Sequence, residues 1–280
     1  LENGANTSFV HALLDERVPV EQVVSDPIVQ VEAAGGARHP KIPPPPALYG
    51  PSRRNSHGPD LTIAATRERL SQDARALPPA AGGPVVGGAL LGDGAGRPAF
   101  SPSDGARLVG HVREAGEADI AAAFAAARKA QPAWDAAGGP ARAQVLRAMG
   151  DALEAERDRL IGLCAREAGK TLADGIAEVR EAVDFCRYYA HLAETRFAGP
   201  EALTGPSGEV NTLELRGRGV FVCISPWNFP LAIFTGQVCA ALAAGNAVLA
   251  KPAEQTPLIA TEAVRLFVKA GLPPDVLALL

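Results

Sequence analysis

The chain has 280 residues and a formal net charge of −4 at pH 7, and 47% of its residues are apolar, enough to bury the core of one large domain or two small ones. Both signs of charge are interleaved without a basic face, so nucleic-acid binding through this stretch is disfavoured. No apolar run reaches the roughly 18 residues that a membrane-spanning helix needs.

The first 30 residues predict a short amphipathic helix followed by two proline breakers, Pro19 and Pro27. Such a segment cannot form a core alone. Residues 31–84 then become Pro-rich and polar, with prolines at every position from 43 to 46, and predict a connector that is ordered in part by the surfaces it crosses. The apolar face of the first helix is formed by Phe9, Val10, Leu13 and Leu14.

The middle of the chain predicts a little β-structure and then a layer of helices. Short β signals at 85–86 and 107–112 are separated by turn residues and predict a small sheet or an edge addition. Three amphipathic patterns follow, at about 117–130, 141–167 and 172–195, and predict helices that must pack on another layer.

The last eighty residues supply that layer. They alternate an apolar strand Val220–Ile224, a helix near 231–244, a strand Ala247–Ala250 and a helix near 256–270. This order predicts an α/β fold with a Rossmann-type, doubly wound parallel sheet, preceded by the helical layer and the Pro-rich linker. Because the chain ends on the apolar residues 277–280, we expect unpaired sheet edges and an exposed apolar terminus.

Ligands of such sheets bind beyond the carboxyl ends of the strands, which directs attention to the residues that follow each strand. Residues 225–230, Ser-Pro-Trp-Asn-Phe-Pro, follow the first strand, and two prolines stiffen the turn around Asn228. The side-chain amide of Asn228 could stabilise a developing oxyanion, or it could cap the next helix.

Residues 251–257, Lys-Pro-Ala-Glu-Gln-Thr-Pro, follow the second strand. Lys251 and Glu254 stand where Rossmann folds hydrogen-bond a nucleotide ribose. The alternative is a solvated surface turn in which Thr256 caps the following helix. No G-x-G-x-x-G follows either strand, so the usual dinucleotide fingerprint is absent from the sequence.

The cysteines and histidines predict neither a disulfide framework nor a metal site. Cys239 stands in a Gly-Gln-Val-Cys sequence inside a predicted helix and is interpreted as a packing residue. The remaining cysteines, Cys164, Cys186 and Cys223, are also interpreted as core residues with reduced thiols. The five histidines are scattered without metal-ligand spacing.

Segments 219–230, 244–248 and 251–257, in this order, resemble the aldehyde dehydrogenase superfamily, and the similarity extends from about residue 84 to the end. Upstream segments that fit the same family are Trp134, Pro140, Arg142, 167–172 and 178–179.

More narrowly, residues 1–10 and 166–190 resemble the proline utilisation A family, and 39–43 and 48–50 look like its connecting segment. In that family a flavin-dependent proline dehydrogenase barrel precedes an aldehyde dehydrogenase. The resemblance implies that 1–30 end the barrel, 31–84 are the linker and 85–280 begin a truncated NAD-binding domain. The first residue, Leu1, is not an initiator methionine, and we interpret the chain as an internal fragment.

The resemblance also implies a reaction, in which a cysteine thiolate attacks glutamate semialdehyde, hydride passes to NAD and hydrolysis releases glutamate. Asn228 would be the oxyanion donor, Lys251 and Glu254 would bind the adenosine ribose, and Glu2 would approach the FAD of the proline dehydrogenase part. The nicotinamide side would be lined by Ile224, Ser225, Pro226 and Trp227.

The family's nucleophilic cysteine and general-base glutamate have no counterpart in these residues, so the isolated chain is expected to be inactive. The resemblance further implies a bacterial cytoplasmic enzyme that forms homo-oligomers and associates peripherally with membranes through its flavin half. The alternative function is a non-catalytic aldehyde dehydrogenase-like module or a truncated gene product.

Overall fold

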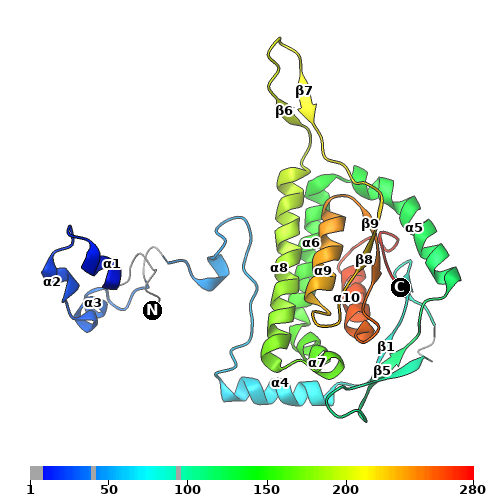
Figure 1. The fold of residues 1–280 in the computed structure, drawn as a ribbon, viewed down its shortest axis with the longest axis horizontal. Helices are drawn as coiled ribbons and strands as arrows, with labels where there is room; N and C mark the ends of the chain where they lie inside the picture. The colour runs from blue at the N-terminus through cyan, green and yellow to red at the C-terminus, as the bar shows by residue number, and fades with distance from the viewer. Residues whose placement is uncertain (1–8, 39–41, 93–95) are drawn as a thin grey trace. The chain divides into compact units, whose positions relative to one another are not determined.

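The computed structural model describes residues 9–38, 42–92 and 96–280. The chain divides into two units, Leu1–Pro44 and Pro45–Leu280 (Figure 1). In the first unit, three short helices span Phe9–Leu14 (α1), Val20–Val23 (α2) and Pro27–Ala33 (α3). Pro19 precedes α2 and Pro27 is the first residue of α3, where a missing N–H costs nothing. The predicted N-terminal helix and both breakers are confirmed.

The predicted connector contains regular structure that its composition concealed. The second unit begins with a short 3₁₀ helix at Pro45–Ala47 (η1), and helix α4 spans Ala64–Ala76. This helix lies between Pro-rich stretches but contains neither proline nor glycine, and it buries Leu70 and Ala74. Gly162 on a later helix packs against Ala74, where a Cβ would meet the Cα of Ala74 at 3.1 Å.

The helical layer consists of four helices, where the sequence predicted three. The predicted helix at 141–167 is wrong as one element, because it is interrupted at Glu156, whose φ of −97° and ψ of 14° end one helix before the next begins. No proline or glycine marks this break, so the amphipathic pattern runs through it. The helices span Glu117–Ala136 (α5), Gly138–Ala155 (α6), Arg157–Ala168 (α7) and Leu172–Arg196 (α8).

The predicted parallel strands belong to a five-stranded sheet with the order β3-β2-β10-β9-β8. Strands β8 (Val220–Ile224) and β9 (Ala247–Lys251) are parallel, as predicted, and β10 (Leu277–Leu279) is parallel to β9. Antiparallel strands β2 (Val85–Val86) and β3 (Ala89–Leu90) complete it.

The apolar end of the chain is covered, contrary to expectation. Leu277, Ala278 and Leu279 are 0%, 4% and 2% exposed, because β10 lies between β9 and β2 rather than at a sheet edge. Strand β8 does form an edge of this sheet, and its Val222 and Ile224 side chains are 59% and 66% exposed.

The remaining strands lie outside the parallel sheet. Three of them form a sheet in the order β1-β5-β4, and two form the hairpin that projects beyond the helices in Figure 1. Only β5 among them was predicted from its residues. They span Ala80–Gly82 (β1), Arg97–Phe100 (β4), Leu108–Val112 (β5), Glu201–Leu203 (β6) and Asn211–Leu213 (β7).

Helices α9 (Ala232–Ala243) and α10 (Pro257–Lys269) cover the sheet, and α8 packs on the outer side of α9. Gly236 of α9 allows this close approach, since a Cβ there would meet the Phe185 ring at 3.0 Å. The last carbonyls of α9 are also paired: Trp134 Nε1 donates to Leu242 O at 3.0 Å and buried Arg142 Nε to Ala243 O at 3.1 Å.

Within the described part of the chain, no helix is both long and apolar enough to cross a bilayer.

Candidate functional site

The two loops singled out by sequence lie side by side at one edge of the sheet. Strands β8 and β9 pair in register up to Ile224 and Lys251, so both end at the same level. The backbone N–H of Ser225 donates to the carbonyl of Lys251 at 3.0 Å, and the Ser225 hydroxyl lies 3.3 Å from Oε1 of Gln237. The first loop is therefore anchored to the end of β9 and to helix α9.

Asn228 lies on the exposed part of this loop, and the proposed role as a helix cap is wrong. The cap position of α9 is Leu231, and no side chain of the cap residue bonds the helix start. The first backbone N–H groups, those of Leu231 and Ala232, instead donate to Oε2 of Glu178 at 3.2 Å and 2.9 Å. The Asn228 amide makes no hydrogen bond to any described residue, so it is available to a ligand.

Glu178 connects α8 to this loop through a buried ion pair. Its side chain is 2% exposed, and Lys170 Nζ lies 3.0 Å from Oε1. The same ammonium sits 4.6 Å from the centroid of the Phe229 ring, a cation–π distance. Lys170 thus neutralises the buried carboxylate and holds the residue that directly follows Asn228.

Helix α10 begins in the same way, which also corrects the second capping interpretation. Thr256 occupies the cap position, but its side chain does not cap and its buried hydroxyl has no partner in the described chain. Glu167 accepts from the backbone N–H groups of Leu258 and Ile259 at 2.6 Å and 2.8 Å. Burial raises the pKa of Glu167 to about 8, although these two N–H donors act to lower it.

Lys251 and Glu254 are brought together on the second loop. Lys251 Nζ and Glu254 Oε2 are 3.1 Å apart, and both side chains are largely exposed. The pKa of Glu254 is lowered, first by its own backbone N–H and then by Lys251. Arg97 of β4 donates to the carbonyl of Glu254 at 2.6 Å and pairs with Glu114, which fixes the loop from the neighbouring sheet.

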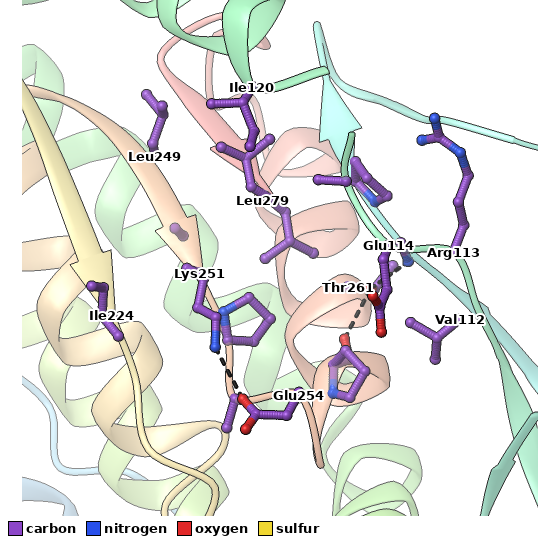
Figure 2. A pocket seen from close by; sticks show the side chains of 18 of the residues that line it. Val112, Arg113, Glu114, Ile120, Ile224, Leu249, Lys251, Glu254, Thr261 and Leu279 are labelled. Carbon is purple, nitrogen blue, oxygen red and sulfur yellow. Dashed lines mark hydrogen bonds and ion pairs between the residues drawn. The ribbon is translucent and has the colours of Figure 1, made fainter. Parts of the chain in front are cut away.

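Both members of this ion pair line a cavity of about 560 Å³. Figure 2 shows Ile224 and Leu249 on adjacent strands facing it, with Ile120 of α5 on the opposite side. The cavity is therefore apolar inside and charged at its rim, and its volume falls in the range of small-molecule sites. Further lining residues include Val112, Arg113, Glu114, Thr261 and Leu279.

Three of the predicted cofactor residues, Ile224, Lys251 and Glu254, line the cavity. The cofactor residues Ser225, Pro226 and Trp227, and the predicted oxyanion donor Asn228, lie in the adjoining loop and do not line it. Glu2 lies outside the described residues.

Apart from Ile224, the apolar walls were not predicted from the sequence, and neither were the two capping carboxylates. The alternation of side chains along a strand could have predicted the walls. Residues two apart on one strand face the same side, as do Val222 and Ile224 on β8, and Leu249 and Lys251 on β9. No local sequence pattern predicts the roles of Glu167 and Glu178, because the backbone N–H groups they accept from lie 91 to 92 and 53 to 54 residues away in the sequence, respectively.

The cysteines are packing residues, as predicted. All four are buried, and Cys239 Sγ lies 3.6 Å from Cys186 Sγ between α9 and α8. Burial raises the pKa of the Cys239 and Cys164 thiols well above the usual range, which suppresses the nucleophilic thiolate. The Gly-Gln-Val-Cys sequence around Cys239 is therefore unrelated to a reactive site.

Known proteins resemble this chain in sequence and in fold. The model of the aldehyde dehydrogenase family matches residues 93–280. The bifunctional protein PutA of Klebsiella aerogenes is 44% identical over 100% of this chain, and the chain spans only 21% of that relative.

Solved structures give the same result. Proline utilisation A of Bradyrhizobium japonicum superposes with a TM-score of 0.75 at 43% identity, over 100% of this chain and 25% of the other. A Thermus 1-pyrroline-5-carboxylate dehydrogenase with bound NAD superposes with a TM-score of 0.75 at 29% identity, over 85% of this chain and 45% of the other.

Proposed function

Since this chain belongs to the aldehyde dehydrogenase family, we propose that it is part of an NAD-dependent enzyme that oxidises L-glutamate γ-semialdehyde to glutamate in proline catabolism. The observation that carries the proposal is the meeting of two loops at one sheet edge, where Lys251 and Glu254 border the cavity and Asn228 presents an unengaged amide beside it. Relatives named for proline utilisation and for 1-pyrroline-5-carboxylate dehydrogenase support the choice of substrate.

The cavity fits the adenosine half of NAD. Val222 and Leu249 offer apolar surface to a base, and the rim offers a donor in Lys251 and an acceptor in Glu254 for the two hydroxyls of a ribose. We assign Ile224, at the end of β8, and Ser225, Pro226 and Trp227, in the anchored loop, to the nicotinamide side. Bound NAD would supply the hydride acceptor.

Asn228 would act on the substrate itself. Attack on an aldehyde places negative charge on its oxygen, and a pre-positioned amide N–H stabilises that charge more in the transition state than in the ground state. The two flanking prolines and the contact between Lys170 and Phe229 hold the loop, so little reorganisation accompanies the reaction. Because the four thiols of these residues are buried, we assign the nucleophile to another part of a longer polypeptide.

We propose that this longer polypeptide also contains a proline dehydrogenase with FAD; the name bifunctional protein that its relatives carry supports a second enzyme in the same chain. Residues 1–30 would then end its barrel, with Glu2 near the flavin, 31–84 would connect the two enzymes and 85–280 would begin the dehydrogenase domain. We further propose a homo-oligomeric, cytoplasmic enzyme that associates peripherally with membranes through its flavin half.

The test is a substrate comparison on the full polypeptide encoded by the gene that contains these 280 residues. NADH formation should show a kcat/KM at least about tenfold higher for L-glutamate γ-semialdehyde than for succinate semialdehyde, which lacks the α-amino group and is one carbon shorter. Equal values, or a preference for succinate semialdehyde, would remove the proposed substrate. The 280-residue chain by itself should form no NADH above background, and activity in that chain would show that its own residues include a nucleophile.

A further inference from the structure

A second, smaller cavity lies away from the sheet edge and is rich in arginine. It has a volume of about 210 Å³ and is enclosed by α4, the turn between β4 and β5, and the end of α7. Arg75, Arg107 and Arg166 line it, together with a single carboxylate, that of Asp104. Nothing in the proposed dehydrogenase reaction uses these residues.

Arg166 is a buried cation that forms no close ion pair among the described residues, and the Asp104 carboxylate acts on it only at longer range. Its side chain donates to the carbonyls of Leu77 and, at 2.8 Å, Leu108, while the residue is only 9% exposed. Its Nε is buried and has no hydrogen-bond partner in that part of the chain. Burial and the neighbouring Arg107 charge disfavour the Arg166 cation more than Asp104 favours it, so an anion in the cavity would stabilise Arg166.

The one carboxylate at the cavity is already engaged. Asp104 Oδ1 accepts from the backbone N–H groups of Ala106 and Arg107 at 3.0 Å and 2.7 Å, and its other oxygen lies 4.0 Å from Arg107 Nε. Arg75 forms no ion pair with any described residue. Three cations therefore face one carboxylate, which leaves an excess of two positive charges at the cavity.

The cavity also carries hydroxyl groups suited to an oxyanion. Ser101 is 3% exposed, and its hydroxyl lies 2.8 Å from that of Ser103, so either one can direct a proton into the cavity. Ser71 contributes a further hydroxyl from α4. Arginine guanidinium groups and hydroxyls are the usual partners of phosphate oxygens.

We infer that this cavity binds a small dianionic oxyanion of the phosphate class, held by Arg107, Arg166 and the Ser101–Ser103 pair. A volume of 210 Å³ admits phosphate or a small phosphate monoester but lies below the size of sites that take nucleotides. The bound anion would tie the connector helix α4 to the first strands of the dehydrogenase unit, because the lining residues come from both.

Isothermal titration of inorganic phosphate into the 280-residue chain, at pH 8 and constant ionic strength, tests this inference. We expect one saturable site, weakened at least about tenfold by Arg107→Gln, whose side chain is exposed and bears no structural contact beyond Asp104. The matched control is Arg128→Gln, at an exposed position of α5, which should change the affinity less than about twofold. Circular dichroism confirms that each variant is folded.

A second arm uses glycerol 2-phosphate. Binding comparable to that of phosphate identifies a phosphoryl group on a metabolite as the ligand, and binding of phosphate alone identifies the free ion. The inference is overturned if phosphate gives no saturable binding, or if the variants at Arg107 and Arg128 weaken it alike.

Discussion

Glu167 and Glu178 perform for α10 and α9 the role that a cap residue usually performs within its own helix. Each side chain accepts two backbone N–H groups at the start of a helix; Glu178 does so while paired with Lys170, and Glu167 does so with a pKa that burial raises to about 8. Because α9 and α10 follow the two loops of the site, these distant side chains position Asn228, Lys251 and Glu254. The loop residues were identifiable from the sequence by their place after apolar strands, whereas the capping carboxylates required the packed helices.

Replacing Glu178 should destabilise the fold strongly. Glu178→Gln removes the counterion of Lys170 and weakens the acceptor for two backbone N–H groups, so we expect a loss of about 3 kcal/mol in the free energy of unfolding. Urea denaturation measures it. Glu181→Gln, on the same helix but exposed and without an ion pair among described residues, should cost less than about 0.5 kcal/mol. Equal losses in the two variants would show that the buried pair has no special role.

Glu167 should give the fold a distinct pH dependence. Burial raises its pKa from 4.5 to about 8, so between these values the folded chain retains a proton that the unfolded chain has lost. Its contribution to stability is complete below pH 4.5 and is lost as the pH rises through about 8, at roughly 1 kcal/mol per pH unit within the window. Urea denaturation from pH 5 to pH 8.5 measures this slope.

Glu167→Gln should flatten that slope, because an amide does not titrate. Glu117→Gln, at an exposed position of α5, should leave it as in the parent chain. A slope that survives in Glu167→Gln would have to come from another group.

At the scale of elements, local sequence patterns predicted those elements whose residues carry their own signal. Strand β8 and helices α8, α9 and α10 show apolar runs or amphipathic repeats bounded by Gly or Pro, and the structure confirms them within two residues. Strand β10 was not predicted, because its local sequence carries no such signal. Its three apolar residues form a strand only when β9 and β2 are present on either side. The break between α6 and α7 likewise has no marker in the local sequence. The direction of α7 is determined by its packing against α4.

Gly139, at the start of α6, allows a close approach to the end of α8. Gly139 donates its N–H to the carbonyl of Phe197 at 3.0 Å, and a Cβ at this position would collide with the carbonyl oxygens of Ala193 and Phe197. Gly139→Ala should therefore lower the free energy of unfolding by about 2 kcal/mol or more, measured by urea denaturation.

Gly116→Ala is the matched control for this helix contact. Its φ of −93° is accessible to alanine, and the nearest atom to its Cβ would be Asp119 Oδ2 at 3.8 Å, so it should cost less than about 1 kcal/mol. If Gly139→Ala is as mild as Gly116→Ala, the two helices tolerate a wider separation than the packing indicates.

For the whole molecule, the family model and the curated relatives place the chain in the aldehyde dehydrogenase family, and the parallel sheet brings an apolar cavity and the exposed Asn228 amide to one edge. Composition and order of elements predicted this architecture. They could not predict the close-packed walls of the cavity, which join residues from β4, β5, α5 and the parallel sheet. The chain spans only 21% of the length of its relative from Klebsiella aerogenes. Enzymatic activity therefore has to be measured on the longer polypeptide.

The most direct measurement is steady-state kinetics of that polypeptide with L-glutamate γ-semialdehyde and NAD, comparing Asn228→Ala with Lys251→Met. Asn228→Ala should lower kcat by about 10²- to 10³-fold with little change in the KM for NAD, because the amide acts on the transition state. Lys251→Met should raise the KM for NAD and leave kcat nearly unchanged, because it removes a cofactor contact. An Asn228→Ala enzyme with unaltered kcat, or a Lys251→Met enzyme with unaltered KM, would contradict the assignment of these two loops.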